Sequence, residues 1–183
     1  ASATLVSSRV SGDMYFDLAS DGAGYQSIII PAGGARQPYT DQTGQNVEDE
    51  EGNIRSLNDL KMVGGEVFNF AVRTEPKAIK KLLEFSSKSV DEIDYFFFHQ
   101  ANKFMLEMIR KSLKLKKKQV PYSMTKFGNT SSASIPLTLS LLGDTVRNTR
   151  IGMCGFGIGL SIGCGFFEIG DEFVNEFIEY DAD

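Results

Sequence analysis

The spacing of apolar and polar residues predicts strands and long loops in the first third of the chain. Residues 1–8 have the composition of a strand, and 27–30 form a short apolar run that Pro31 closes. The polar, glycine-rich stretches 11–24 and 32–53 are expected to be loops, and a loop as long as the second is usually functional or mobile. Because the first predicted strand starts at Ala1 itself, we expect the chain to begin inside a domain.

Helical spacing begins at Met62, where apolar residues recur three and four positions apart. It predicts one long helix that Pro76 kinks or divides, and two further helices from Ala101 to about Leu115 and from Ser134 to about Val146. The other predictions are a capped turn at 89–92, strands at 93–98, 119–122, 151–156 and 161–169, a turn at 127–130 and a short helix within 171–183. This order of elements favours a layered α/β fold.

Composition narrows the class of protein. The chain has 183 residues, of which 42% are hydrophobic and 23% charged, which suits one globular domain and excludes disorder throughout. The net charge of −5 makes nucleic acid an unexpected principal partner. No apolar run approaches the ~20 residues that span a bilayer, and no basic-then-apolar leader opens the chain. We therefore expect a cytoplasmic protein with no nucleic-acid or membrane partner.

The few metal-binding and nucleophilic side chains exclude several chemistries. One histidine and two cysteines do not make a usual zinc site, so we expect no metal. Cys154 and Cys164 are expected to be buried, unreactive thiols, because neither has a helix N-terminus or a basic neighbour in the sequence. The glycines from Gly155 to Gly159 resemble a nucleotide loop only weakly. A strand follows them where that loop needs a helix, so a hairpin turn is the better interpretation.

Two polar residues could take part in catalysis. His99 follows a predicted buried strand and precedes a helix, so it should lie at the sheet edge where sites of α/β proteins gather. A helix N-terminus there favours neutral imidazole, which can donate a hydrogen bond to a developing oxyanion. Asn129 lies in a run of small residues and can donate through its amide. Taken alone, the residues favour the structural interpretation, a hydrogen-bonded core histidine and a turn or cap asparagine.

A basic cluster also stands out in this acidic chain. It consists of Arg110, Lys111, Lys114, Lys116, Lys117 and Lys118. Such a cluster is typical of a solvated helix end, where lysines suit the dipole. It would also suit docking of an acidic partner.

Several motifs together resemble one family. They are His99-Gln100-Ala101-Asn102, the run from Gly128-Asn129-Thr130 to Ile135-Pro136, the glycine-rich hairpin, Ser20–Gly24, Pro31–Gly34 and Met62–Phe68. Over nearly the whole chain the sequence resembles the C-terminal half of ketoacyl synthase III, the 3-oxoacyl-(acyl carrier protein) synthase. The resemblance implies a thiolase-like α/β fold, in which this chain forms one βαβαβαββ half of a five-layer αβαβα sandwich.

The resemblance also implies an activity, which is decarboxylative Claisen condensation of an acyl-CoA primer with malonyl carrier protein. His99 and Asn129 would then hydrogen-bond the malonyl thioester carbonyl. Four residues match positions that line the pantetheine and CoA tunnel or lie beside the active site, namely Gly64, Phe68, Asn102 and Phe156. Lys103 and Lys111 would help to dock the carrier protein, although Asn69 and Phe104 stand at positions that are often basic.

The largest departure from the family is the missing nucleophile. In the family the acylated cysteine lies in the N-terminal half, and neither Cys154 nor Cys164 matches it. We therefore expect residues 1–183 to be the C-terminal domain, inactive alone, of a parent that forms a homodimer and uses acyl-CoA and acyl carrier protein without a resident cofactor. The alternatives are a plain acyltransferase, a structural subunit that pairs with a separate N-terminal half, and a carrier-binding module.

Overall fold

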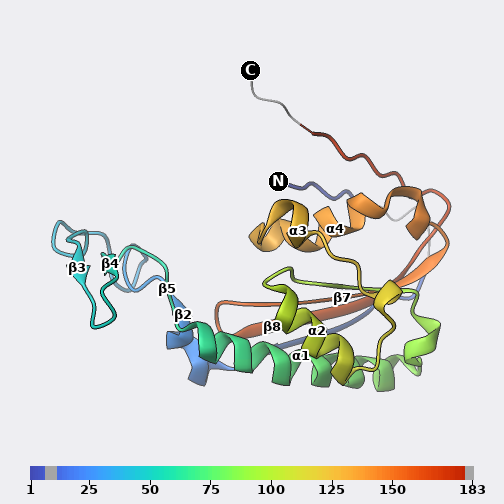
Figure 1. Ribbon diagram of the computed structural model, residues 1–183, viewed down its shortest axis with the longest axis horizontal. Coiled ribbons are helices and arrows are strands. Elements are labelled where there is room, and N and C mark those ends of the chain that lie inside the picture. Colours follow the sequence, from blue (N-terminus) through green and yellow to red (C-terminus); the bar gives the residue numbers. More distant parts are fainter. Residues whose placement is uncertain (7–11, 180–183) are drawn as a thin grey trace. The chain divides into compact units, whose positions relative to one another are not determined.

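The structure is a computed structural model that describes residues 1–6 and 12–179 (Figure 1). The described residues form two compact units. The first unit takes its residues from 1–19, 71–156 and 162–183, and the second comprises 20–70 and 157–161. Among the helices described, none is long and apolar enough to cross a membrane.

The first unit is built on a four-stranded sheet. Its strands are β1 (Tyr15–Ser20), β6 (Tyr95–Phe98), β7 (Thr149–Gly157) and β8 (Ser161–Ile169), in the order β1-β8-β7-β6. β6 and β7 run parallel, and β7 and β8 form the predicted hairpin. Parallel pairing requires a crossover connection, so the segment between β6 and β7 must return across a face of the sheet.

Helices cover both faces of this sheet. α1 (Gly64–Ser86) enters the first unit at residue 71 and lies on the same side as α2 (Lys103–Ser112), whereas α3 (Met124–Phe127) and α4 (Ser134–Leu142) lie on the other (Figure 1). Short 3-10 helices occupy Val90–Glu92, Lys117–Gln119, Ser131–Ala133 and Gly143–Val146. The capped turn at 89–92 is confirmed, since the Glu92 carboxylate accepts a hydrogen bond from the Ser89 N–H.

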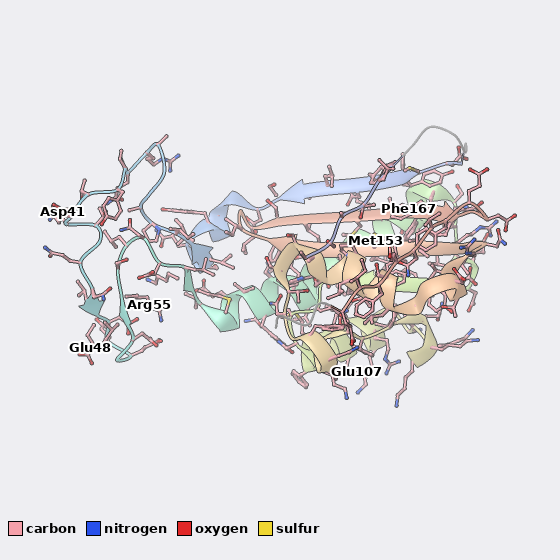
Figure 2. The ribbon with its side chains drawn as sticks, turned by 90° about the horizontal axis from the view of Figure 1, so that it is seen from above. Asp41, Glu48, Arg55, Glu107, Met153 and Phe167 are labelled. Atoms are coloured by element: carbon pink, nitrogen blue, oxygen red, sulfur yellow. A yellow bond between two sulfur atoms is a disulfide. The ribbon has the colours of Figure 1, made fainter. Side chains whose placement is uncertain are left out.

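Alternation along β6 explains the layers. Phe96 and Phe98 stack on one face, and Tyr95 and Phe97 lie together on the other. Phe96, Phe97 and Phe98 are all fully buried. A strand that is apolar on both faces is typical of a parallel sheet covered twice. On the face with Phe97, the core includes Val146 and Ile151 and partly buried α4 side chains. Met153 and Phe167 belong to this core and lie on β7 and β8 (Figure 2).

The sequence also predicts that Pro76 kinks or divides the long helix. The structure keeps α1 as one helix of 23 residues with Pro76 inside it. Pro76 and its neighbours Glu75, Ala78 and Ile79 are buried. Packing of the apolar stripe on both sides of the proline therefore holds the helix together despite the lost backbone hydrogen bond.

The second unit holds the long polar stretch. Two small antiparallel pairs form there, β2 (Ile28–Ile29) with β5 (Lys61–Met62) and β3 (Val47–Glu48) with β4 (Ile54–Arg55). Another element of this unit is a 3-10 helix at Gly22–Ser27. The predicted loop is thus partly ordered.

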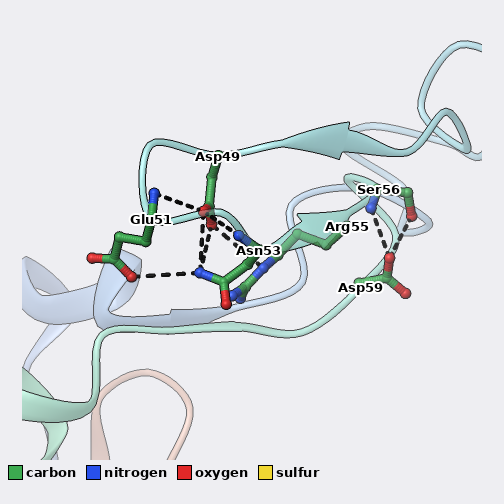
Figure 3. Close-up of polar contacts among 6 residues, drawn as sticks. All are labelled: Asp49, Glu51, Asn53, Arg55, Ser56 and Asp59. Carbon is green, nitrogen blue, oxygen red and sulfur yellow. Dashed lines mark hydrogen bonds and ion pairs between the residues drawn. The ribbon is translucent and has the colours of Figure 1, made fainter.

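Local side-chain hydrogen bonds shape the turn between β3 and β4. One oxygen of Asp49 accepts hydrogen bonds from the backbone N–H groups of Glu51 and Asn53 and from the Asn53 amide (Figure 3). Asp59 accepts in the same way from the backbone and hydroxyl of Ser56. Because Asp readily bonds the backbone a few residues onward, a polar sequence can form a fixed turn without a core.

Three predicted elements are wrong, namely the strands at 1–8 and 119–122 and the C-terminal helix. Residues 1–6 are not a strand and 7–8 lie outside the described residues, while the first strand is β1, within a stretch predicted to be loop. β1 is an edge strand with Phe16 and Leu18 exposed, so its burial pattern is weak. No strand forms at 119–122, where Gln119 instead donates to the Ile93 carbonyl.

The predicted C-terminal helix is absent over 171–179, and residues 180–183 lie outside the description. This segment is held by side chains instead, with the Asn175 amide donating to the Ser140 carbonyl and Phe177 against Phe127.

The prediction for the two cysteines also needs correction. Cys154 and Cys164 are buried as expected, but they are joined by a disulfide across β7 and β8, with their Cα atoms 4.2 Å apart. The hairpin brings them opposite each other, which their separation in the sequence alone did not reveal. Neither sulfur is a thiol in this structure.

Candidate functional site

His99 lies where the sequence places it, directly after β6 at the carboxyl end of the parallel strands. Its backbone N–H donates to the Cys154 carbonyl at 3.0 Å, which continues the β6–β7 pairing by one residue. Phe156, two residues further along β7, sets the edge of its ring against the imidazole, with centroids 5.4 Å apart. Two neighbouring strands therefore position this pair at the edge where α/β sheets bind ligands.

The imidazole of His99 is half-buried and bound on one side. Its Nδ1 lies 2.8 Å from the Ser134 hydroxyl, which belongs to the first residue of α4. Burial lowers the pKa of His99, and a hydrogen bond with the Ser131 backbone partly opposes that shift. Because its pKa lies below the usual 6.5, the ring is mainly neutral at pH 7, and its nitrogens contact Ser134 and the Ser131 backbone.

Asn129 lies in the loop between α3 and α4. Its Oδ1 accepts a hydrogen bond from the Ser131 N–H at 2.9 Å, and the side chain is exposed. With the amide oxygen engaged, the group that Asn129 can offer to a ligand is its NH₂, a donor. The same Ser131 backbone contacts His99, so one residue links the two predicted catalytic side chains.

Ser131 itself has a left-handed backbone, with φ of 53°. A residue other than glycine in this region costs of order 1 kcal/mol and tends to occur at functional sites. The loop is thus held in a specific shape around the residue that His99 and Asn129 share.

Four buried polar side chains form a hydrogen-bond network next to His99. Gln100, Ser123, Ser134 and Thr138 are all nearly or fully buried. The Gln100 side chain accepts from the Ser123 N–H and donates to the Phe98 carbonyl, and Ser123 in turn contacts the Thr138 hydroxyl. Sequence reasoning did not single out these residues, because their contacts join segments far apart in the chain.

The predicted residues of α2 lie on its surface. Asn102 caps the helix, its Oδ1 accepting from the Met105 N–H at 2.8 Å. Lys103 and Lys111 are exposed at the two ends of α2. Their exposure is compatible with docking, and Asn102 is exposed as well.

Not all of the predicted basic cluster is available to a partner. Arg110 donates to the Glu107 carboxylate and to the Leu115 carbonyl, and Lys116 pairs with Asp91. The hydrogen bonds from Arg110 and from Tyr122 lower the pKa of Glu107, which is labelled in Figure 2, to about 2. Burial and the bond to Glu107 raise the pKa of Tyr122. This trio fixes α2 against the following segment, so Arg110 is a structural residue here.

Gly64 and Phe68 lie in the second unit, one turn apart at the start of α1. Gly64 is exposed and Phe68 is half-buried. The structure therefore brings His99, Asn129 and Phe156 to one edge of the first unit's sheet. It places the two predicted tunnel residues on a different unit.

The sheet, the helix after His99 and the Asn129 loop define one class of protein, the thiolase-like synthases. Residues 83–169 match the family model described as 3-Oxoacyl-[acyl-carrier-protein (ACP)] synthase III C terminal. A Burkholderia xenovorans 3-oxoacyl-(acyl-carrier protein) synthase structure has a TM-score of 0.76 and 37% identity, over 88% of this chain and 46% of that one. A 3-oxoacyl-(acyl-carrier-protein) synthase III structure reaches a TM-score of 0.81 at 32% identity, over 87% and 50%.

Curated relatives carry names of the same family as these structures. A Campylobacter jejuni protein, whose name refers to 3-oxoacyl-[acyl-carrier-protein] synthase 3, is 34% identical over 180 residues, covering 98% of this chain and 51% of that protein. The beta-ketoacyl-[acyl-carrier-protein] synthase III of Rhodopirellula baltica is 32% identical, over 87% and 44%. The chain belongs to the 3-oxoacyl-ACP synthase III family and carries its C-terminal domain. It spans about half the length of the curated relatives it matches.

Proposed function

We propose that this chain supplies the decarboxylating half of a 3-oxoacyl-ACP synthase III, which condenses an acyl-CoA primer with malonyl carrier protein. The observation that carries the proposal is the arrangement around Ser131. His99 is mainly neutral at pH 7 and has Nδ1 beside the Ser134 hydroxyl, while the amide oxygen of Asn129 is engaged by the Ser131 N–H. A ring N–H of His99 at the end of β6 and the NH₂ of Asn129 in the loop before α4 are two donors that suit a thioester oxygen that becomes negative.

In the proposed reaction, the malonyl thioester oxygen accepts hydrogen bonds from His99 and Asn129. The bond between the α-carbon and the carboxylate breaks, carbon dioxide leaves, and its electron pair forms an enolate whose charge lies on that oxygen. The enolate carbon then attacks the acyl thioester held on the enzyme, and the thiolate departs. The ring of Phe156 against His99 keeps water from one side of the imidazole.

The acylated nucleophile has to come from residues outside this chain. Both of its cysteines are buried and joined to each other, so neither can be acylated. We therefore propose that the 183 residues alone lack synthase activity and that the parent works as a homodimer. We also propose that acyl-CoA and carrier protein are its substrates, that it needs no resident cofactor, and that it acts in the cytoplasm.

Carrier docking is proposed on the exposed face of α2. Lys103 and Lys111 are about two turns apart on α2, and both are exposed. Charge reversal at Lys111 should weaken binding of an acidic carrier protein, whereas reversal at the exposed Lys80 of α1 should not. Equal loss in both variants would exclude a docking role for α2.

The test of the chemistry is release of carbon dioxide from malonyl carrier protein by the complete protein. Removing one oxyanion donor typically costs about 10²–10³ in turnover, so His99→Ala and Asn129→Ala should each lower decarboxylation by that order. A complete protein that transfers acyl groups without releasing carbon dioxide would instead be a plain acyltransferase. Absence of both activities would favour the structural subunit or the carrier-binding module.

A further inference from the structure

The hydroxyl of Ser134 lies within hydrogen-bond distance of Nδ1 of His99. We propose that this hydroxyl donates to Nδ1 and so keeps the proton on Nε2, making Ser134 a positioning residue for the donor that faces the substrate. The inference deepens the proposed function and rests on it for its catalytic meaning. The hydrogen-bond assignment itself can be tested without any substrate.

The geometry of the Ser134 hydroxyl restricts its role. It is 1% exposed, so water does not compete for it. The backbone N–H of Gln100 donates to its oxygen at 3.3 Å, and Nδ1 of His99 lies 2.8 Å away. A hydroxyl has one proton to give, and a buried donor without an acceptor is costly. Nδ1 is the acceptor within hydrogen-bond distance of it among the described residues.

The surrounding network holds this hydroxyl in place. Thr138 donates to the Ser134 carbonyl at 2.6 Å, so its own proton is used. The Ser123 hydroxyl must then donate to Thr138, at 2.6 Å. Gln100 connects the end of β6 to the segment before α3 through its amide. The network therefore joins β6, that segment and α4 around one imidazole nitrogen.

Assigning the proton to Nε2 has a chemical consequence. An imidazole with Nδ1 protonated would present a lone pair to the thioester oxygen, which is repulsive. With Nε2 protonated it presents a donor, as decarboxylation requires. In serine hydrolases the group that fixes the histidine tautomer is worth a large factor in turnover, which shows how much this choice can matter.

The experiment is ¹⁵N NMR of the protein labelled at histidine, recorded well above the usual histidine pKa of 6.5. This chain has a single histidine, and the His99→Gln variant identifies its signals in the complete protein. We expect a protonated Nε2 and an unprotonated, hydrogen-bonded Nδ1. Ser134→Ala should shift the Nδ1 signal, and Ser134→Thr should restore it.

Two controls separate positioning from stability. Ser132→Ala removes an exposed hydroxyl from the same turn and should leave the Nδ1 signal unchanged. Thr138→Val breaks the bonds to Ser123 and to the Ser134 carbonyl, so its fall in thermal midpoint measures the stability cost of the network while the Ser134 hydroxyl itself is kept. A wild-type spectrum with the proton on Nδ1 would overturn the proposal, and so would an Nδ1 signal insensitive to Ser134→Ala.

Turnover gives the second readout. Loss of the outer hydrogen-bond partner of a functional histidine costs about 10- to 100-fold in metal sites, and we expect a similar fall in decarboxylation for Ser134→Ala with KM little changed. If the spectra behave as expected but the wild-type protein releases no carbon dioxide, the proposed function fails while the tautomer assignment stands. If Ser134→Ala shifts the signal and turnover is unchanged, the positioning role is refuted.

Discussion

Glu75 should make the free energy of unfolding fall as pH rises, the opposite of a carboxylate such as Glu107 whose pKa is lowered by hydrogen bonds. The side chain of Glu75 lies in the middle of α1, is fully buried, and neither carboxylate oxygen has a hydrogen-bond partner. Burial alone raises the pKa of Glu75 well above its usual 4.5. The folded protein therefore holds a proton there that the unfolded chain releases.

The sign and size of the effect follow from proton linkage. Below pH 4.5 both states are protonated and the group costs least. Above it the unfolded state ionises first, so the free energy of unfolding falls by about 1.4 kcal/mol per pH unit until the folded pKa is reached. Glu75→Gln removes this proton, and Glu75→Met also removes the unpaired polar atoms, worth about 1–3 kcal/mol more.

The assay is urea unfolding of both variants and the wild type at a series of pH values upward from 4.5, the usual pKa, above which linkage to this group acts. Because the chain has no tryptophan, unfolding is followed by circular dichroism. The control variant is Glu84→Gln, which makes the same substitution at an exposed position of α1. We expect the advantage of Glu75→Gln over the wild type to grow with pH. A difference that is constant across this range, or equal to that of Glu84→Gln, would refute the reasoning.

Three further predictions concern other parts of the fold. Because hydrogen bonds lower the pKa of Glu107 to about 2, Glu107 stabilises above the unfolded value of 4.5 and the gain is lost as pH falls toward 2; Glu107→Gln should flatten the acid limb of a stability curve. Gly152→Ala places a Cβ 2.8 Å from Phe96 and 2.9 Å from Phe166, so denaturant melts should show a loss of about 1–3 kcal/mol. Asp49→Ala should speed hydrogen exchange at Glu51 and Asn53 but leave the global melting temperature nearly unchanged, since their amides lose their acceptor. Unchanged exchange at these amides would count against the Asp49 turn.

The sequence predicts the elements whose signal is local. Apolar periodicity predicts α1, α2 and α4, and the glycine-rich hairpin is confirmed as β7 and β8. β1 was missed because Phe16 and Leu18 are exposed, so this edge strand lacks the burial that alternation reports. The strand predicted at 119–122 failed because Gln119 uses its amide to hold the backbone near Ile93 instead of joining the sheet.

For the site too, the features with a local signal were predicted and the contacts between distant segments were not. His99 was predicted at a strand end from the apolar run before it, and Asn129 from its motif. The contacts that make them donors, to Ser134 and Ser131, could not be predicted, because they depend on how α4 returns to the sheet. Pro76 shows the converse, since a strong local signal for a break was overridden by burial of the helix around it.

The parallel pairing of β6 with β7 has a consequence for the order of folding. Tyr95 pairs with Ile151, so residues 96–150, which include α2, α3 and α4, form the loop that closes when the two strands meet. Pairings between distant segments form slowly, because the entropy of closing the intervening loop is lost before the contacts form. His99 takes its place on the Cys154 carbonyl only after that closure. Assembly of the site therefore depends on one of the long-range closures of the fold, whereas the helices around it rest on local contacts.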